Sequence, residues 1–131
     1  MQALAASLDG RRRVLVVDDE EAIRDLLVKM LELADYEVEG APDGPSALEY
    51  LKKEPCDLMF VDLKMPGMDG LALIRQARAA KPGLPVIVVT GYSSEASAIE
   101  ALNMGVSAYI TKPFRVPQGL EAASRALTKI G

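Results

Sequence analysis

Five short apolar runs, each separated from the next by a helical pattern, constrain the fold of this chain more than any other feature. Three of the runs are almost continuously apolar, which is typical of parallel strands covered on both faces. Strict alternation of strands and helices implies right-handed crossovers and helices on both faces of one sheet. The predicted fold class is therefore α/β, with a doubly wound parallel sheet. The predicted strands are Val14–Val17, Tyr36–Gly40, Leu58–Val61, Val86–Val89 and Ala108–Ile110.

Helices are predicted after each strand, because apolar residues recur there three and four positions apart. The central helices are expected near residues 44–53, 70–80 and 94–104. At 131 residues the chain fits one domain, which is predicted over residues 11–131, and residues 1–10 are interpreted as a tail. One face of the first helix carries Ile23, Leu26, Leu27, Met30 and Leu31, and most of that spacing is repeated in the last helix by Leu120, Ala123, Ser124 and Leu127, while the fourth helix is indicated by Ala98, Ile99 and Leu102.

The chain contains no histidine, which excludes several common kinds of site. A Ser-His-Asp triad, a Cys-His pair, a histidine-ligated zinc site and an internal phosphohistidine are all ruled out. Because Cys56 is the only cysteine, no disulfide can form within the chain, as fits a reducing cytoplasm. We expect Cys56 to be a small buried apolar side chain at the start of a strand.

Charge and hydropathy narrow the class of partner. The net charge is −4, whereas nucleic-acid-binding domains usually carry a basic face, so no direct nucleic-acid partner is expected. The run Arg11-Arg12-Arg13 is interpreted as a solvated approach to the first strand. No segment reaches the roughly 18 apolar residues of a membrane span, and the first ten residues lack the pattern of a secretion signal. A cytoplasmic protein with no membrane partner is predicted.

Polar residues follow four of the five predicted strands. Asp18 and Asp19 follow the first strand, Asp62 the third, Thr90 the fourth and Lys112 the fifth. In a doubly wound sheet, ligands bind outside the carboxyl ends of the strands, so these side chains should converge. Two carboxylates about 5 Å apart repel by roughly 3 kcal/mol at an effective dielectric constant of about 20, and one lysine does not balance three of them. A hard divalent cation is the natural complement, and Mg²⁺ prefers oxygen ligands.

Phosphoryl transfer is the leading functional hypothesis for these polar residues at the carboxyl edge of the sheet. The metal and Lys112 can neutralise phosphoryl oxygens while a carboxylate attacks the phosphorus, and the Thr90 hydroxyl can bind a further oxygen. A flavin phosphate would need a Ser, Thr or Gly loop after the first strand, where this chain has acids. A nucleotide-binding P-loop needs Gly-x-x-x-x-Gly-Lys-Ser/Thr, which is absent.

Each of these residues also has a purely structural interpretation. Asp18 or Asp19 could cap the helix that begins near Glu20. Glu20 and Glu21 are assigned to that helix start, where acids interact favourably with the helix dipole. The functional interpretation depends on all the polar residues meeting at one rim.

Four segments of this sequence together resemble the receiver domain of two-component response regulators. They are "VLVVDDEE", "LMFVDLKMPGMDGLALI", "PVIVVTGY" and "GVSAYITKPF", and the resemblance runs from about Arg12 to Thr128. It implies a flavodoxin-like fold with five helices and strand order 2-1-3-4-5. It also implies that Asp62 accepts a phosphoryl group from a phosphohistidine of a sensor histidine kinase or phosphotransfer protein.

The resemblance assigns the metal ligands as well. Asp19 and Asp62 would bind Mg²⁺ directly, Asp18 mostly through water, and the backbone carbonyl of Lys64 would complete the protein ligands. These assignments come from the family motif and not from spacing.

The resemblance further implies how phosphorylation is read out. Thr90 and Lys112 would contact the phosphoryl oxygens, and Tyr109 would turn inward when Thr90 moves. This would change the face made by the fourth helix, fifth strand and fifth helix, which would meet an output partner or a second copy of the chain. The peptide between Lys112 and Pro113 would be cis, which the small cost of cis before proline permits.

Three functions remain open at this point. The first is a phosphoacceptor switch that signals but turns over no metabolite, and the second is a receiver-like binding module that works without phosphorylation. The third is a phosphatase of the haloacid-dehalogenase type, but its Asp-x-Asp-x-Thr motif is not matched by Asp18-Asp19-Glu20-Glu21-Ala22. Lys64 and Tyr92 flank the acceptor and the hydroxyl, so we expect them to shield a phosphoryl group and lengthen its lifetime.

Overall fold

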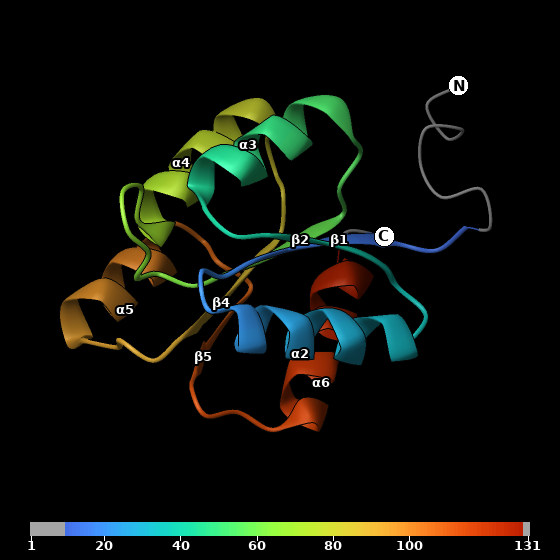
Figure 1. The fold of residues 1–131 in the computed structure, drawn as a ribbon. Coiled ribbons are helices and arrows are strands. Elements are labelled where there is room, and N and C mark those ends of the chain that lie inside the picture. The colour runs from blue at the N-terminus through green and yellow to red at the C-terminus, as the bar shows by residue number, and fades with distance from the viewer. Residues whose placement is uncertain (1–9, 130–131) are drawn as a thin grey trace.

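The computed structural model describes residues 10–129, which form a central sheet between two layers of helices (Figure 1). All neighbouring strands are parallel, in the order β2-β1-β3-β4-β5. The predicted fold class and strand order are therefore confirmed. The strands are β1 (Arg13–Val17), β2 (Glu37–Ala41), β3 (Leu58–Val61), β4 (Val86–Thr90) and β5 (Ala108–Thr111).

Five helices in the described residues connect and follow the strands, as predicted. Figure 1 shows α3 and α4 on one face of the sheet and α2 and α6 on the other. No helix among residues 10–129 is long and apolar enough to cross a bilayer. Nine of the ten residues predicted as a tail lie outside the described residues. The helices are α2 (Glu21–Leu33), α3 (Gly44–Lys53), α4 (Gly70–Ala80), α5 (Glu95–Asn103) and α6 (Val116–Lys129).

Two hydrophobic cores, one on each face of the sheet, explain the continuous apolar runs. Successive side chains of a strand point to opposite faces, so Leu15 and Val17 enter the core under α3 and α4, whereas Val14 and Val16 enter the core above α2 and α6. The same alternation holds in β3, where Phe60 faces α2 and α6. Because both faces are covered, the central strands are apolar along most of their length, and their polar residues, Arg13 and Thr90, stand at strand ends.

Helix α5 is the least buried of the helices in the described residues. Ile99 and Leu102 are 50% and 61% exposed, and Ala101 is its buried residue. Arg75 on α4 pairs with Glu100 on α5 at 2.5 Å, but both side chains are about half exposed, so this ion pair adds little stability. Leu26 and Ser124, which belong to the patterned faces of α2 and α6, are exposed as well.

The basic run Arg11-Arg12-Arg13 is not wholly solvated, contrary to the prediction, because the Arg13 side chain is largely buried. The Arg13 guanidinium pairs with Glu37 and with Glu54, each at 3.2 Å, across two different elements. Its backbone N–H donates to the Asp57 carboxylate at 2.8 Å. Arg13 therefore links the beginning of β1 to β2 and to the residue that follows α3.

Cys56 precedes β3 and is half-buried, close to its predicted role. Its thiol donates to the backbone carbonyl of Leu58 at 3.3 Å. Burial raises the pKa of the Cys56 thiol to about 11, so it is protonated at neutral pH and packs as a small apolar group.

Candidate functional site

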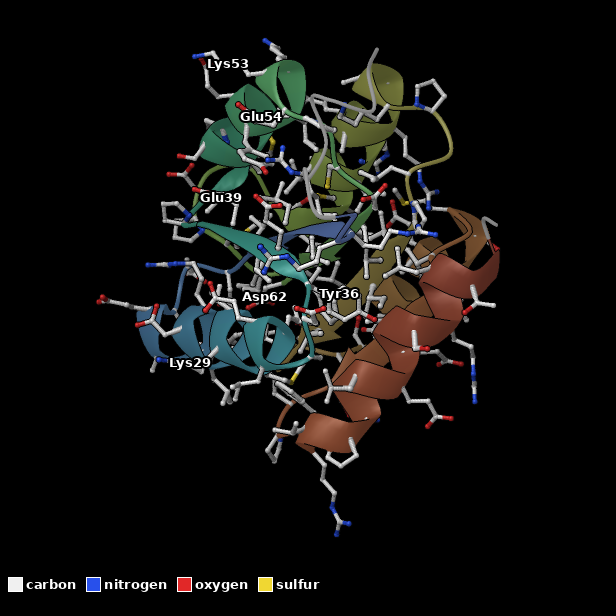
Figure 2. All side chains as sticks on the ribbon, turned by 90° about the vertical axis from the view of Figure 1, so that its right-hand side faces the viewer. Lys29, Tyr36, Glu39, Lys53, Glu54 and Asp62 are labelled. Atoms are coloured by element: carbon white, nitrogen blue, oxygen red, sulfur yellow. The ribbon has the colours of Figure 1, made fainter. Side chains whose placement is uncertain are left out.

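The ends of β1 and β3 bring two buried carboxylates together. Asp18 and Asp62 are 1% and 3% exposed, and with Thr90 they are the buried polar residues of the described chain. The backbone N–H of Asp62 donates to the carbonyl of Val17 at 3.1 Å, which extends the pairing of β3 with β1 up to Asp62. Figure 2 shows Asp62 at the level of the sheet, between the two helix layers.

Lys112, which follows β5, places its ammonium among three carboxylates. Its Nζ lies 3.0 Å from Asp18 Oδ2, 3.0 Å from Asp62 Oδ2 and 2.9 Å from Glu20 Oε1. Its backbone N–H donates to the carbonyl of Thr90 at 2.9 Å, which anchors it to the end of β4. Burial acts to lower the pKa of Lys112, but hydrogen bonds to the three carboxylates outweigh it and raise the pKa. The ammonium is therefore charged throughout the neutral range.

Asp18 has a different electrostatic balance. Burial raises its pKa, and this effect is opposed by the backbone N–H of Glu20 and by Lys112. The Glu20 N–H donates to Asp18 Oδ1 at 2.9 Å, while Asp18 Oδ2 faces Lys112. Asp18 therefore closes a local turn and contributes to the site, but it does not cap the helix as one interpretation predicted. The N-cap residue of α2 is Glu20, and no side chain caps that position.

Glu20 is the site residue that sequence reasoning missed. It was assigned to the helix start alone, yet its side chain reaches Lys112. Its backbone is extended, with φ −86° and ψ 111°. The strand ends at Val17 and the chain bends at Asp19, so the alternation of a strand does not extend to Glu20, and no spacing rule in the sequence marks it as a site residue.

The carboxylates that could share one cation are those of Asp18, Glu20 and Asp62, whose oxygens lie within 4.8 Å of one another. Asp19 is exposed; together with Lys64 and Tyr92 it lines a cavity over Asp62. Carboxylate oxygens are the ligands that Mg²⁺ prefers, so the donor set present at these strand ends fits that ion.

The remaining predicted residues surround this cluster. Thr90 Oγ1 accepts from the backbone N–H of Tyr92 at 3.1 Å. The Tyr109 hydroxyl donates to Ser93 Oγ at 3.1 Å, and the ring is half-buried against the core. The peptide between Lys112 and Pro113 is cis, as predicted.

The side chains of Lys64 and Tyr92, on the loops that follow β3 and β4, are also in contact. The Lys64 backbone N–H donates to Asp62 Oδ1 at 3.1 Å, and its ammonium lies 5.1 Å from the centroid of the Tyr92 ring. A cation over an aromatic face at this distance is a favourable contact. It joins the β3–α4 loop to the β4–α5 loop beside the cavity that Asp62 also lines.

Comparison with known proteins identifies this arrangement. Residues 14–124 match the family model described as the response regulator receiver domain. The chain belongs to this family. It is a receiver domain of two-component response regulators, a class of phosphoacceptor signalling domains.

Relatives of this receiver domain support the assignment. Response regulator MprA of Mycobacterium ulcerans is 38% identical over 117 residues, which cover 89% of this chain and 50% of that protein. A CheY-like receiver domain protein from Methanospirillum hungatei has a TM-score of 0.88 and 37% identity, covering 92% of this chain and 96% of that one. The receiver domain of NtrX from Brucella abortus has a TM-score of 0.83 and 36% identity, over 88% and 98% of the two chains. The receiver domain thus spans about half the length of the curated relatives it matches.

Proposed function

We propose that this receiver domain is a phosphorylation-activated switch that accepts a phosphoryl group on Asp62 from the phosphohistidine of a sensor histidine kinase or phosphotransfer protein. The observation that carries the proposal is the contact of Lys112 Nζ with Asp62 Oδ2, at 3.0 Å, inside a buried acidic cluster at the strand ends. A lysine held there by three carboxylates is poised to neutralise the oxygens of an incoming phosphoryl group.

The transfer can be written from the residues of this chain and its donor. A carboxylate oxygen of Asp62 attacks the phosphorus, the bond between phosphorus and the imidazole nitrogen breaks, and its electron pair stays on the imidazole, which takes up a proton. The Lys112 ammonium remains charged and stays beside Asp62. Thr90 accepts one hydrogen bond, which leaves its O–H free to donate to a phosphoryl oxygen.

Mg²⁺ is the proposed cofactor, held by Asp18, Asp19, Asp62 and the backbone carbonyl of Lys64. When bound, it would neutralise charge on the phosphoryl oxygens during transfer. Asp18 and Asp62 already place carboxylate oxygens together, and Asp19 lines the adjoining cavity.

The proposed readout uses Thr90 and Tyr109. A Thr90 hydroxyl drawn toward the phosphoryl group would vacate space for the Tyr109 ring, whose present hydrogen bond to Ser93 is exposed and easily exchanged for water. The changed face is formed by α5, β5 and α6, and we propose that an output partner or a second copy docks there. The exposed Ile99 and Leu102 favour this surface. The absence of metabolite turnover and of nucleic-acid or membrane partners, and the cytoplasmic location, stay predictions.

The test is incubation with acetyl phosphate and Mg²⁺, followed by mass spectrometry of the intact protein. The wild type should gain about one alkali-labile phosphoryl group, and Asp62→Asn should gain none. Asp69→Asn is the matched control, because Asp69 caps α4 through the N–H of Ala72 and asparagine caps equally well. Absence of an adduct in the wild type would favour the binding module, and sustained phosphate release far above one equivalent would favour a phosphatase.

The lifetime of the phosphoryl group should depend on Lys64 and Tyr92. Their side chains form a cation–π contact, and both residues line the cavity that reaches Asp62. In Lys64→Ala, Tyr92→Ala protein we expect the phosphoryl group to be lost about two-fold to five-fold faster, the effect of roughly 0.5 to 1 kcal/mol. The loss is measured by removing the phosphoryl donor and following the remaining phosphorylated protein over time by mass spectrometry. The remote Lys53→Ala variant should match the wild type, and an unchanged lifetime in the double variant would contradict the shielding role.

A further inference from the structure

Glu20 occupies a hydrogen bond of Lys112 that the proposed phosphotransfer needs. An ammonium has three N–H donors. In this structure Lys112 has three carboxylate acceptors, on Asp18, Asp62 and Glu20, all at 2.9 to 3.0 Å. Every donor is therefore taken before phosphorylation. A phosphoryl oxygen can bind Lys112 only when one of these contacts is given up.

Burial decides which contact is given up most easily. While Asp62 is still a free carboxylate, before its bond to phosphorus forms, the side chains of Asp18 and Asp62 are 1% and 3% exposed, so either one released from Lys112 at that stage would stay out of water. An unpaired buried charge is strongly unfavourable. The Glu20 side chain is 61% exposed and becomes hydrated as soon as it leaves Lys112. Glu20 is consequently the partner that leaves at the lowest cost.

The backbone around Glu20 does not need to move when its side chain leaves. Its N–H is held by Asp18 Oδ1 at 2.9 Å, and its carbonyl accepts from the backbone N–H of Arg24 at 2.9 Å. The Arg24 guanidinium also donates to the carbonyl of Asp18 at 2.8 Å. Release is therefore a rotation of one exposed side chain on a fixed turn.

We propose that Glu20 is a built-in competitor of the phosphoryl group for Lys112. Its carboxylate stabilises the unphosphorylated site and is displaced when a phosphoryl oxygen takes its place on the ammonium. Glu20 is a positioning residue that acts through Lys112, and it sets how readily the site accepts a phosphoryl group. This inference rests on the proposed function and deepens it.

The test compares Glu20→Gln and Glu20→Ala with Glu21→Gln. Glutamine keeps the size of Glu20 but makes a weaker, neutral hydrogen bond, and alanine removes the acceptor altogether. Glu21 is an exposed residue in the first turn of α2, so Glu21→Gln makes the same change in net charge one residue away. Each variant is titrated with beryllium fluoride, a phosphoryl mimic, at saturating Mg²⁺, and binding is followed by tyrosine fluorescence because the chain has no tryptophan.

Relative to Glu21→Gln, both Glu20 variants should bind the mimic about two-fold to five-fold more tightly, as expected for loss of one partly exposed ion pair. Initial rates of adduct formation from acetyl phosphate should rise by a similar factor. In the absence of any donor, the NMR signals of the Lys112 side chain should shift in the Glu20 variants and stay in place in Glu21→Gln.

The possible failures are distinguishable. A wild-type protein that binds no mimic and forms no adduct would overturn the proposed function itself. A wild type that does both, with Glu20 variants equal to Glu21→Gln, would overturn only the competition. Weaker mimic binding in the Glu20 variants would overturn it too, since Glu20 would then assist the phosphorylated site.

Discussion

Replacing Lys112 by methionine is expected to lower the free energy of unfolding by about 3 to 5 kcal/mol at neutral pH. Methionine keeps much of the length of lysine but removes the charge that pairs with Asp18, Asp62 and Glu20. Three carboxylates would then lie within 4.8 Å of one another without this cation. Two of them are buried and cannot gain full hydration. Urea denaturation at constant protein concentration and low salt measures the loss.

The dependence of the Lys112→Met stability on Mg²⁺ and on pH should show that repulsion between the carboxylates causes the loss. Mg²⁺ should restore more stability to Lys112→Met than it adds to the wild type, because the ion would meet three carboxylates that no lysine shares. A carboxyl whose pKa is raised in the folded state destabilises the protein when ionised and not when protonated. Since burial raises the pKa of Asp18 already in the wild type, the loss should shrink as the pH falls from about 7 toward about 4.

The matched control is Lys64→Met, at the same rim but with an exposed side chain over the Tyr92 ring. Its stability should change by no more than about 0.5 kcal/mol. An unchanged denaturation midpoint in Lys112→Met, or a loss that neither Mg²⁺ nor acid reduces, would show that the lysine does not balance these carboxylates.

Replacing Gly70 by alanine is expected to destabilise the protein by about 1 to 3 kcal/mol, although alanine is the better helix former. Gly70 is the first residue of α4 and packs against the backbone of Asp62 and Leu63. A Cβ there would meet the carbonyl oxygen of Asp62 and would lie 2.6 Å from the Cα of Leu63, both backbone atoms. The clash can be relieved only by moving α4 or Asp62. Thermal or urea unfolding measures the first effect.

Movement of Asp62 should also slow phosphorylation. Misplacement of a reacting group by about 1 Å can reduce a rate by about 100-fold, so we expect adduct formation from acetyl phosphate to fall by at least about ten-fold in Gly70→Ala. Gly91→Ala is the control, since its Cβ would lie 3.8 Å from Lys112 side-chain atoms, an ordinary contact. Equal stability and equal rates in the two alanine variants would contradict the steric argument.

Most of the fold follows from local sequence patterns. The apolar run Val86–Val89 predicted β4 to within one residue, because a strand covered on both faces is almost continuously apolar, and the strand continues by one residue to the polar Thr90. The edge strand β2 was displaced by one residue, since its exposed Glu39 and partly exposed neighbours leave a weaker pattern. Helical spacing located α5, although its patterned residues Ile99 and Leu102 are exposed in the structure. Periodicity shows that residues share a face, whereas the neighbouring elements decide whether anything covers it.

The strand ends predicted that Asp18, Asp19, Asp62, Thr90 and Lys112 would meet, because parallel strands bring their carboxyl ends to one edge of the sheet. Which carboxylates share the lysine was settled by tertiary packing. Glu20 and Lys112 are 92 positions apart in the chain, and their contact depends on how the turn after β1 directs its side chains. Asp19, between two residues that face the lysine, is turned to the cavity rim. That choice depends on backbone geometry and burial, which no pattern of residue types specifies.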